Sequence, residues 1–187
     1  MSDTDGVTAV VVLAASDRFF EEFIPTCKQI EIDYDKQCCG VFSAFKKSKS
    51  TEFKERWSLL LEQVDDGWNL LRGVSTTSHV QVNNMLSYAL AGYFSLSRYV
   101  SARIDVLTCL IAKENGSSIP ASAYTSFLHT AEDNRKQLVE TMGPYEELYR
   151  QVKNNLQKNQ KDNDSRQKVK IKKPFHGSFL HFLLSRY

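Results

Sequence analysis

The chain lacks the cysteine spacing that metal binding and redox chemistry use. Its four cysteines are Cys27, Cys38, Cys39 and Cys109, and no two of them form a C-x-x-C motif. Neighbouring cysteines such as Cys38 and Cys39 do not easily bridge each other, because disulfide geometry is restrictive. We therefore expect reduced thiols in a cytoplasmic protein, with reversible lipidation of Cys38 or Cys39 as the alternative.

The chain also lacks an apolar run long enough to cross a membrane. Its most apolar N-terminal stretch, residues 7–15, is far shorter than the roughly 20 residues that span a bilayer. Asp3 and Asp5 precede this stretch, where a secretory signal peptide would carry Lys or Arg. We expect a cytoplasmic location, with peripheral membrane contact as an open addition.

Recognisable catalytic motifs are missing. The sequence holds no phosphate loop, no dinucleotide-binding glycine motif, no nucleophile elbow and no H-E-x-x-H. His129 and Asp133 stand at i and i+4, but a pair of exposed side chains on one helix face accounts for this spacing. We therefore expect neither a metal nor another cofactor, and we predict that the protein is not an enzyme.

A 4-3 spacing of apolar residues recurs along the chain instead. An average step of 3.5 residues keeps one stripe of a helix facing a partner helix. Such stripes run through residues 4–36, 51–72, 78–114 and 120–156. The first stripe includes Leu13, Phe20, Phe23, Cys27 and Ile30, and the second includes Phe53, Trp57, Leu60, Val64 and Leu71. The sequence therefore predicts an all-α protein: an elongated antiparallel bundle of about four long helices with heptad-like packing, followed by a basic C-terminal tail.

Two prolines fall inside the predicted helices. Pro25 removes a backbone hydrogen bond and crowds the preceding turn, so we expect a kink or break near Phe23. Gly143 and Pro144 interrupt the last helix, yet the 4-3 phase continues across them without a slip. This continuity favours one kinked helix over two separate helices.

Residues 78–114 form the longest candidate helix, and its apolar face is broad. Met85 and Phe94 flank its main stripe, so we expect it to contact at least two other helices from the centre of the bundle. The short connection to residues 120–156 predicts that these two helices pair antiparallel. Trp57 and Trp68 are expected to anchor the core.

Charge is distributed unevenly along the chain. From Lys153 to Tyr187 there are nine Lys/Arg and two Asp, a charge of +7, whereas the preceding 152 residues carry −5. The composition changes again near residue 157, where apolar residues almost disappear. We predict a helical bundle domain over 1–156, then a basic linker and a short apolar C-terminal segment over 157–187.

The C-terminal segment combines lysines with aromatic residues. A basic stretch beside an apolar one is typical of attachment to an anionic membrane surface, since charge attracts the segment and apolar side chains insert shallowly. The alternatives are that the segment folds back onto the bundle or docks on another molecule, with nucleic acid disfavoured by the acidic body. The candidate membrane contacts are Lys168, Lys170, Lys172, Lys173, Phe175 and Phe179.

Arg103 and Arg135 occupy stripe positions that are otherwise apolar. Polar residues at such positions often set the register or the oligomeric state of helical assemblies. We name both as candidate partner contacts. The alternative is that each side chain extends to the surface while its stem covers apolar neighbours.

These observations favour a non-catalytic intracellular adaptor or scaffold that binds other proteins through its helix faces. A membrane-active protein that opens its bundle to insert apolar segments is the first alternative. An enzyme with a site between helices is the second. A protein partner is expected, an anionic membrane surface is a second candidate partner, and a homodimer stays open.

Overall fold

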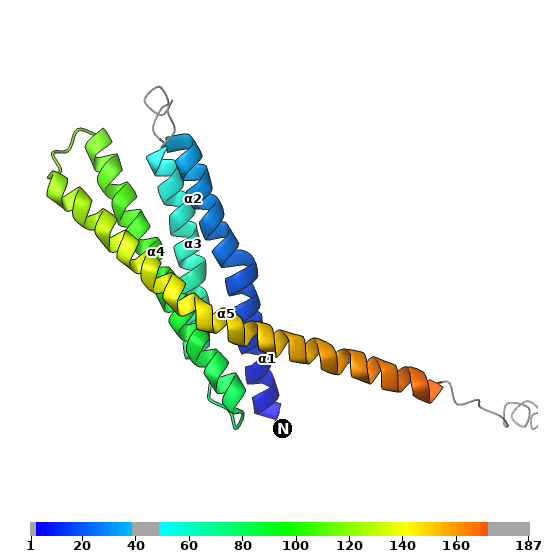
Figure 1. Ribbon diagram of the computed structural model, residues 1–187. Coiled ribbons are helices and arrows are strands. Elements are labelled where there is room, and N and C mark those ends of the chain that lie inside the picture. Colours follow the sequence, from blue (N-terminus) through cyan, green and yellow to red (C-terminus); the bar gives the residue numbers. More distant parts are fainter. Residues whose placement is uncertain (1–2, 39–48, 172–187) are drawn as a thin grey trace, which may run out of the picture. The chain divides into compact units, whose positions relative to one another are not determined.

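A computed structural model describes the backbone of residues 3–38 and 49–171, and the side chains of residues 6–37 and 49–155. All regular structure in these ranges is helical. The chain divides into two compact units, Met1–Tyr149 and Arg150–Tyr187, and the packing described below belongs to the first. The elements are α1 (Asp3–Arg18), the π-helix η1 (Phe19–Phe23), α2 (Ile24–Cys38), α3 (Ser50–Arg72), α4 (Val80–Glu114) and α5 (Ala121–Ile171) (Figure 1).

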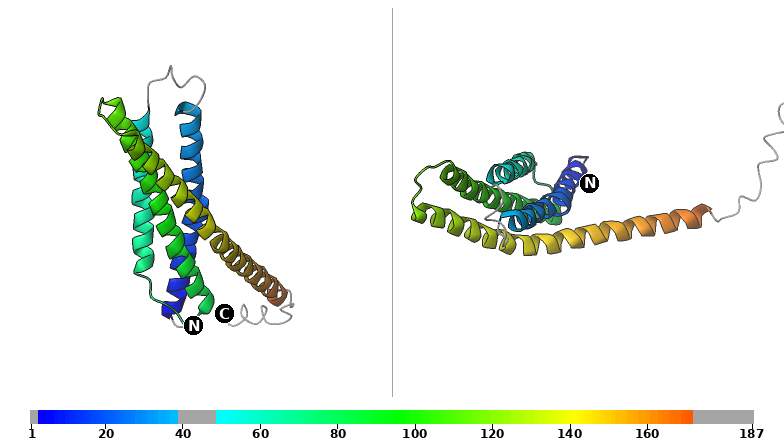
Figure 2. Two further views of the ribbon diagram at one scale, coloured as in Figure 1. Left: turned by 60° about the vertical axis from the view of Figure 1, so that its left-hand side comes forward. Right: turned by 90° about the horizontal axis from the view of Figure 1, so that it is seen from above.

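Four helical segments pack against one another in the unit Met1–Tyr149: α1–η1–α2, α3, α4 and the first part of α5. Seen from above, the first three lie side by side, and residues 121–149 of α5 run along them on the side away from α3 (Figure 2). The prediction of an all-α chain with mutually packed helices is confirmed for the described residues.

The perturbation predicted near Pro25 takes the form of the π-helix η1. Proline cannot donate to the carbonyl four residues earlier, which here belongs to Glu21, and its ring crowds that turn. A π-turn widens the helix at this point, so α1 and α2 continue into each other instead of breaking. At the predicted kink the helix thus accommodates one extra residue and continues.

This π-turn also shifts the predicted stripe on the first helix. The extra residue in the wide turn offsets the helical phase before it, so Val12 and Phe19 are buried where Leu13 and Phe20 were expected. After the turn the prediction is correct, because Phe23, Cys27 and Ile30 are buried. A strict 3.5-residue count cannot anticipate the shift.

α3 and α4 form the tightest pair in the bundle. The predicted α3 stripe is at most 1% exposed, and each such side chain contributes about 1.5–3 kcal/mol. Gly67 lies in this stripe, and a Cβ there would stand 2.3 Å from Cε1 of Tyr93. Glycine therefore lets the Tyr93 ring approach the α3 backbone. The buried α3 stripe is Phe53, Trp57, Leu60, Val64 and Leu71.

α4 is the central helix, as predicted. One of its faces packs on α3 and α1, and a second face packs on α5. Ala102 and Val106 pack with Ala131 of α5, while Asn134 donates a 3.2 Å hydrogen bond to the Arg98 carbonyl. Residue numbers fall along α4 as they rise along α5, so the two helices are antiparallel, as predicted.

An aromatic cluster joins α5 to the first helix. The Phe19 ring lies 5.3 Å from Tyr93 and 5.2 Å from Tyr145, and Phe20 stacks on Tyr149 at 5.0 Å. The Tyr149 hydroxyl donates to carboxylates of Asp17 and Glu21. Packed aromatic rings and a hydrogen-bonded tyrosine hydroxyl thus connect helices that are distant in sequence.

α5 continues through Gly143 and Pro144 as one helix, as the unbroken phase predicted. Its backbone stays helical to Ile171, through the first part of the predicted basic linker. Lys, Gln and Arg are strong helix formers, which favours this continuation. The domain boundary at 156/157 stays a prediction.

No helix in the described ranges is both long enough and apolar enough to cross a membrane.

Candidate functional site

Arg103 lies among aromatic rings inside the bundle. Its guanidinium is 5.6 Å from the Tyr34 ring centroid and 5.9 Å from that of Trp57. The side chain is half-buried, and its Nε is enclosed without a hydrogen-bond partner. Cation–π contacts therefore compensate part of the cost of burying this charge. A partner role for Arg103 stays a prediction.

Arg135 has a different environment. It is exposed, and its Nε and a terminal nitrogen each donate a 2.9 Å hydrogen bond to Glu132 on the same helix. Asn134, one residue earlier, takes the buried position. Arg135 thus lies beside the buried stripe of α5 rather than in it. Arg103 and Arg135 have no contact residue in common among those described above.

The basic tail is described only in part. Lys168 and Lys170 belong to the helical backbone of α5, and their side chains lie outside the described residues. Lys172, Lys173, Phe175 and Phe179 lie outside them altogether. The predicted membrane contact keeps its basis in the sequence alone.

An aromatic pair stands on the outer surface of α3 and α4. The rings of Trp68 and Phe94 lie 6.0 Å apart, and Phe94 is 48% exposed. Arg72 stacks on Trp68 at 4.7 Å and Arg98 on Phe94 at 5.9 Å. Neither guanidinium has a carboxylate partner among the described side chains. We call these four residues the aromatic–arginine surface.

The α4 side of this surface continues as an exposed stripe. Its members recur at 4-3 spacing, like those of the buried stripes, and all are exposed. Apart from Phe94 and Arg98 its side chains are small, so an approaching helix could come close to α4 on either side of them. The stripe residues are Ser87, Ala91, Phe94, Arg98 and Ser101.

The aromatic–arginine surface corrects one prediction. Trp68 was expected in the core but is half-buried at the edge of the core. Phe94 is exposed beside it. On α3, the stripe through Val64 and Leu71 leaves Trp68 to one side. A signal was present in the sequence: arginine follows each aromatic residue by four positions, which stacks it on the ring.

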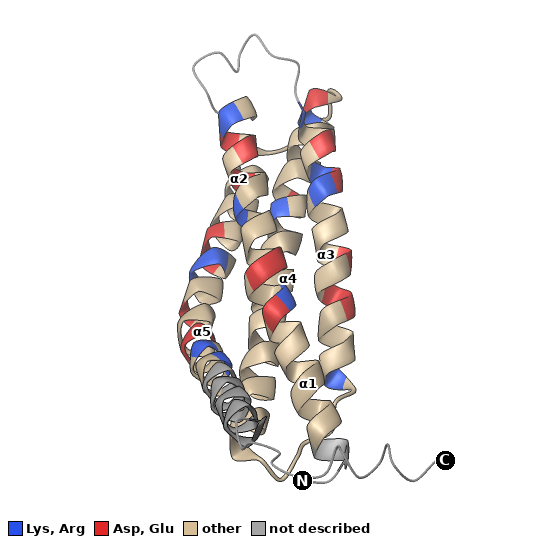
Figure 3. Ribbon diagram, turned by 90° about the vertical axis from the view of Figure 1, so that its right-hand side faces the viewer, with Lys and Arg blue, Asp and Glu red and all other residues tan. Residues whose placement is uncertain are grey.

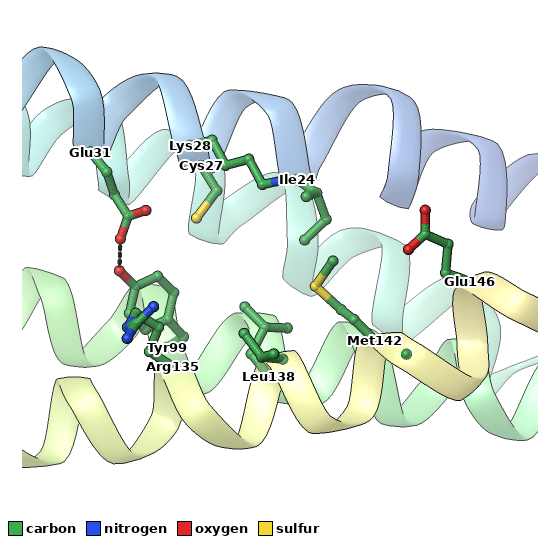
Figure 4. A pocket seen from close by; sticks show the side chains of 11 residues that line it. Ile24, Cys27, Lys28, Glu31, Tyr99, Arg135, Leu138, Met142 and Glu146 are labelled. Atoms are coloured by element: carbon green, nitrogen blue, oxygen red, sulfur yellow. Dashed lines mark hydrogen bonds between the residues drawn. The ribbon is translucent and has the colours of Figure 1, made fainter.

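A cleft of about 410 Å³ opens between α2, α4 and α5 (Figure 4). Cys27 and Ile24 reach it from α2, and Leu138 and Met142 from α5. Burial raises the pKa of the Cys27 thiol to about 12, so the thiol stays protonated at neutral pH. A protonated thiol is a weak nucleophile, and it contributes to an apolar wall.

Tyr99 and Glu31 form the polar end of this cleft. The Tyr99 hydroxyl donates to the Glu31 carboxylate. Burial and this hydrogen bond raise the pKa of Tyr99 above its ordinary value, so it remains a donor. Within the described part of the chain, no group of three or more His, Cys, Asp or Glu could hold a metal ion.

Comparison with known proteins gives no relative for this chain: no family model, no curated protein and no solved structure matches it.

Proposed function

We propose that this protein is a non-catalytic intracellular adaptor whose bundle binds a helix of another protein. The aromatic–arginine surface carries the proposal. Trp and Arg are frequent hot-spot residues of protein interfaces. Here the half-buried Trp68 and the exposed Phe94 each stack with an arginine that has no carboxylate partner among the described side chains. The partner helix would place an apolar side chain over Phe94 and carboxylates beside Arg72 and Arg98.

Site-specific photo-crosslinking in cells tests this proposal. A photoreactive residue at Ala91, within the exposed stripe, should capture a partner protein. The same residue at Thr108, which is exposed 17 residues further along α4, is the matched control. Capture at Ala91 that Phe94→Ala and Arg98→Glu each abolish supports the proposal. Equal capture at both positions, or capture that survives these substitutions, contradicts it.

Membrane contact by the tail is the second part of the proposal. It rests on the charge of +7 between Lys153 and Tyr187. Replacing the three lysines of residues 170–173 with Gln should abolish co-sedimentation with anionic liposomes, because each cation near the surface contributes about 1 kcal/mol. The control replaces the three lysines of residues 46–49. If both variants sediment like the unmodified chain, the tail does not anchor the protein.

A second candidate function is favoured by α1. Residues 6–16 carry no charge, and Val7 and Val10 are 64% and 67% exposed (Figure 3). A helix that is apolar on all sides prefers an apolar environment. The protein would then insert α1 into a bilayer. Dye release from anionic vesicles separates the two functions, since a membrane-active protein causes leakage and an adaptor does not.

A further inference from the structure

We propose that the cleft between α2, α4 and α5 is a binding site for a single-chain anionic amphiphile, namely a fatty-acid carboxylate. The cleft is independent of the aromatic–arginine surface, and the inference goes beyond the adaptor function. Its volume of about 410 Å³ falls within the roughly 300–1,000 Å³ of small-molecule sites and is too small for a helix.

The long walls of the cleft are apolar. Ile24 and Cys27 form one wall, and Leu138 and Met142 face them from α5 (Figure 4). Val139 stands at the opening and is 59% exposed. Walls of this kind accept an alkyl chain and offer no partner to the polar groups of a sugar or a nucleotide.

Gly143 keeps part of the α5 wall bare. It lines the cleft from within a helix, and a Cβ at this position would meet nothing within 4 Å. Space for a larger side chain is therefore present and unfilled. The helix rises about 16 Å from Arg135 to Glu146, at 1.5 Å per residue, and a chain lying along it would pass over this bare backbone at Gly143.

Charge selects the sign of the head group. Four charged residues line the cleft, and three of them are engaged: Arg135 with Glu132, Glu31 with Tyr99, and Glu146 with a neighbour. The remaining one, Lys28, is exposed and forms no hydrogen bond or ion pair with a described residue. Its side chain extends along the rim beside Ile24 (Figure 4). An unpaired ammonium on the rim of an apolar cleft favours a carboxylate head group.

Binding of dodecanoate to the 187-residue chain tests the proposal. Titration calorimetry below the micellar concentration should show one saturable site, and dodecyltrimethylammonium, with the same tail and the opposite charge, should bind more weakly. Lys28→Gln should weaken dodecanoate binding by up to about fivefold, as expected for an exposed ion pair. Lys36→Gln, two turns further along α2, should leave binding unchanged.

Gly143→Leu tests the location of the tail. The leucine side chain would enter the open space at Gly143 and should reduce affinity at least about tenfold, equal to roughly 1.4 kcal/mol. Methyl NMR of labelled methionine locates the ligand without any substitution. The Met142 signal should shift on saturation, and the signal of Met85, which is buried on α4 outside the cleft, should not.

Four results would overturn the proposal: no saturable dodecanoate binding, equal affinity for the cationic amphiphile, unchanged binding by folded Gly143→Leu, or an unshifted Met142 signal. If Gly143→Leu does not fold, the Met142 signal of the unmodified protein decides the question.

Discussion

The hydroxyl of Tyr145 on α5 donates a 2.9 Å hydrogen bond to Oγ of Ser16 on α1, across 129 positions of sequence. Ser16 in turn donates a 2.7 Å hydrogen bond to the Val12 carbonyl. Both side chains are fully buried, at 0% exposure. This short chain of hydrogen bonds fixes the middle of α5 on the first helix.

Tyr145→Phe should lower the free energy of unfolding by about 1 kcal/mol, the typical net contribution of one buried hydrogen bond. Ser16 keeps its own bond to Val12, so no buried donor loses its partner. Urea denaturation measures the change. Tyr124→Phe is the control, since Tyr124 is half-buried and its hydroxyl has no hydrogen bond among the described residues. Equal effects of the two substitutions would contradict the role of the Tyr145 bond.

Gly67→Ala and Gly143→Ala should have opposite effects. At Gly67 the new methyl group would stand 2.3 Å from the Tyr93 ring, which is fully buried and held by a 2.8 Å hydrogen bond to the Ala15 carbonyl. We expect a loss of about 1–3 kcal/mol from overpacking. Gly143→Ala meets no atom and should stabilise by about 0.4–1 kcal/mol, because the unfolded chain loses conformational freedom.

Thermal unfolding of both alanine variants measures these effects. A stable Gly67→Ala protein would show that the Tyr93 ring can move away from α3.

Phe94→Ala should leave the free energy of unfolding within about 0.5 kcal/mol of its original value, since Phe94 is 48% exposed. Trp57→Ala should lower it by about 3–5 kcal/mol, because Trp57 is completely buried. The contrast separates an aromatic residue available for binding from one that holds the core. A large loss of stability in Phe94→Ala would mean that the ring serves packing instead.

Stability should fall at alkaline pH. Burial raises the pKa of Cys27 from 9.0 to about 12 and that of Tyr93 from 10.0 to about 12. Between the lower and upper values the native state keeps protons that the unfolded state has released, so stability is full below pH 9 and declines above it. Each group contributes a slope of at most about 1.4 kcal/mol per pH unit.

Urea unfolding at a series of pH values measures this slope. Cys27→Ala should flatten the curve most between pH 9 and pH 10, where ionisation of the unfolded-state thiol exceeds that of the tyrosine. An identical slope in Cys27→Ala would show that the thiol ionises as easily in the folded protein as in the unfolded one.

The sequence determined the helices and most of the core. A 4-3 spacing of apolar residues predicts which face of each helix is buried, and the stripe from Phe53 to Leu71 is buried as predicted. Helical phase is a local property, because it follows from a fixed number of residues per turn. The antiparallel pairing of α4 and α5 follows from their short connection in the same way.

The apolar spacing did not predict which residue is buried where a helix departs from regular geometry. It also did not predict the position of an apolar residue that lies beside the buried stripe. One residue inserted in η1 moved the buried position from Phe20 to Phe19, and nothing before Pro25 reports how the helix accommodates it. Trp68 is apolar enough for the core but lies beside its stripe. Only the packing of α3 on α4 placed it at the surface with Phe94.

The cleft depended entirely on tertiary structure. Cys27, Tyr99 and Met142 belong to three helices, and no sequence spacing relates them. Their neighbours are set by how far α5 stands from α2, which depends on the rings of Phe19, Phe20 and Tyr145 packed between the helices. Periodicity along one helix indicates which of its faces is buried. The distance between two helices depends on the side chains that pack between them. This distance determines the volume of the cleft that remains.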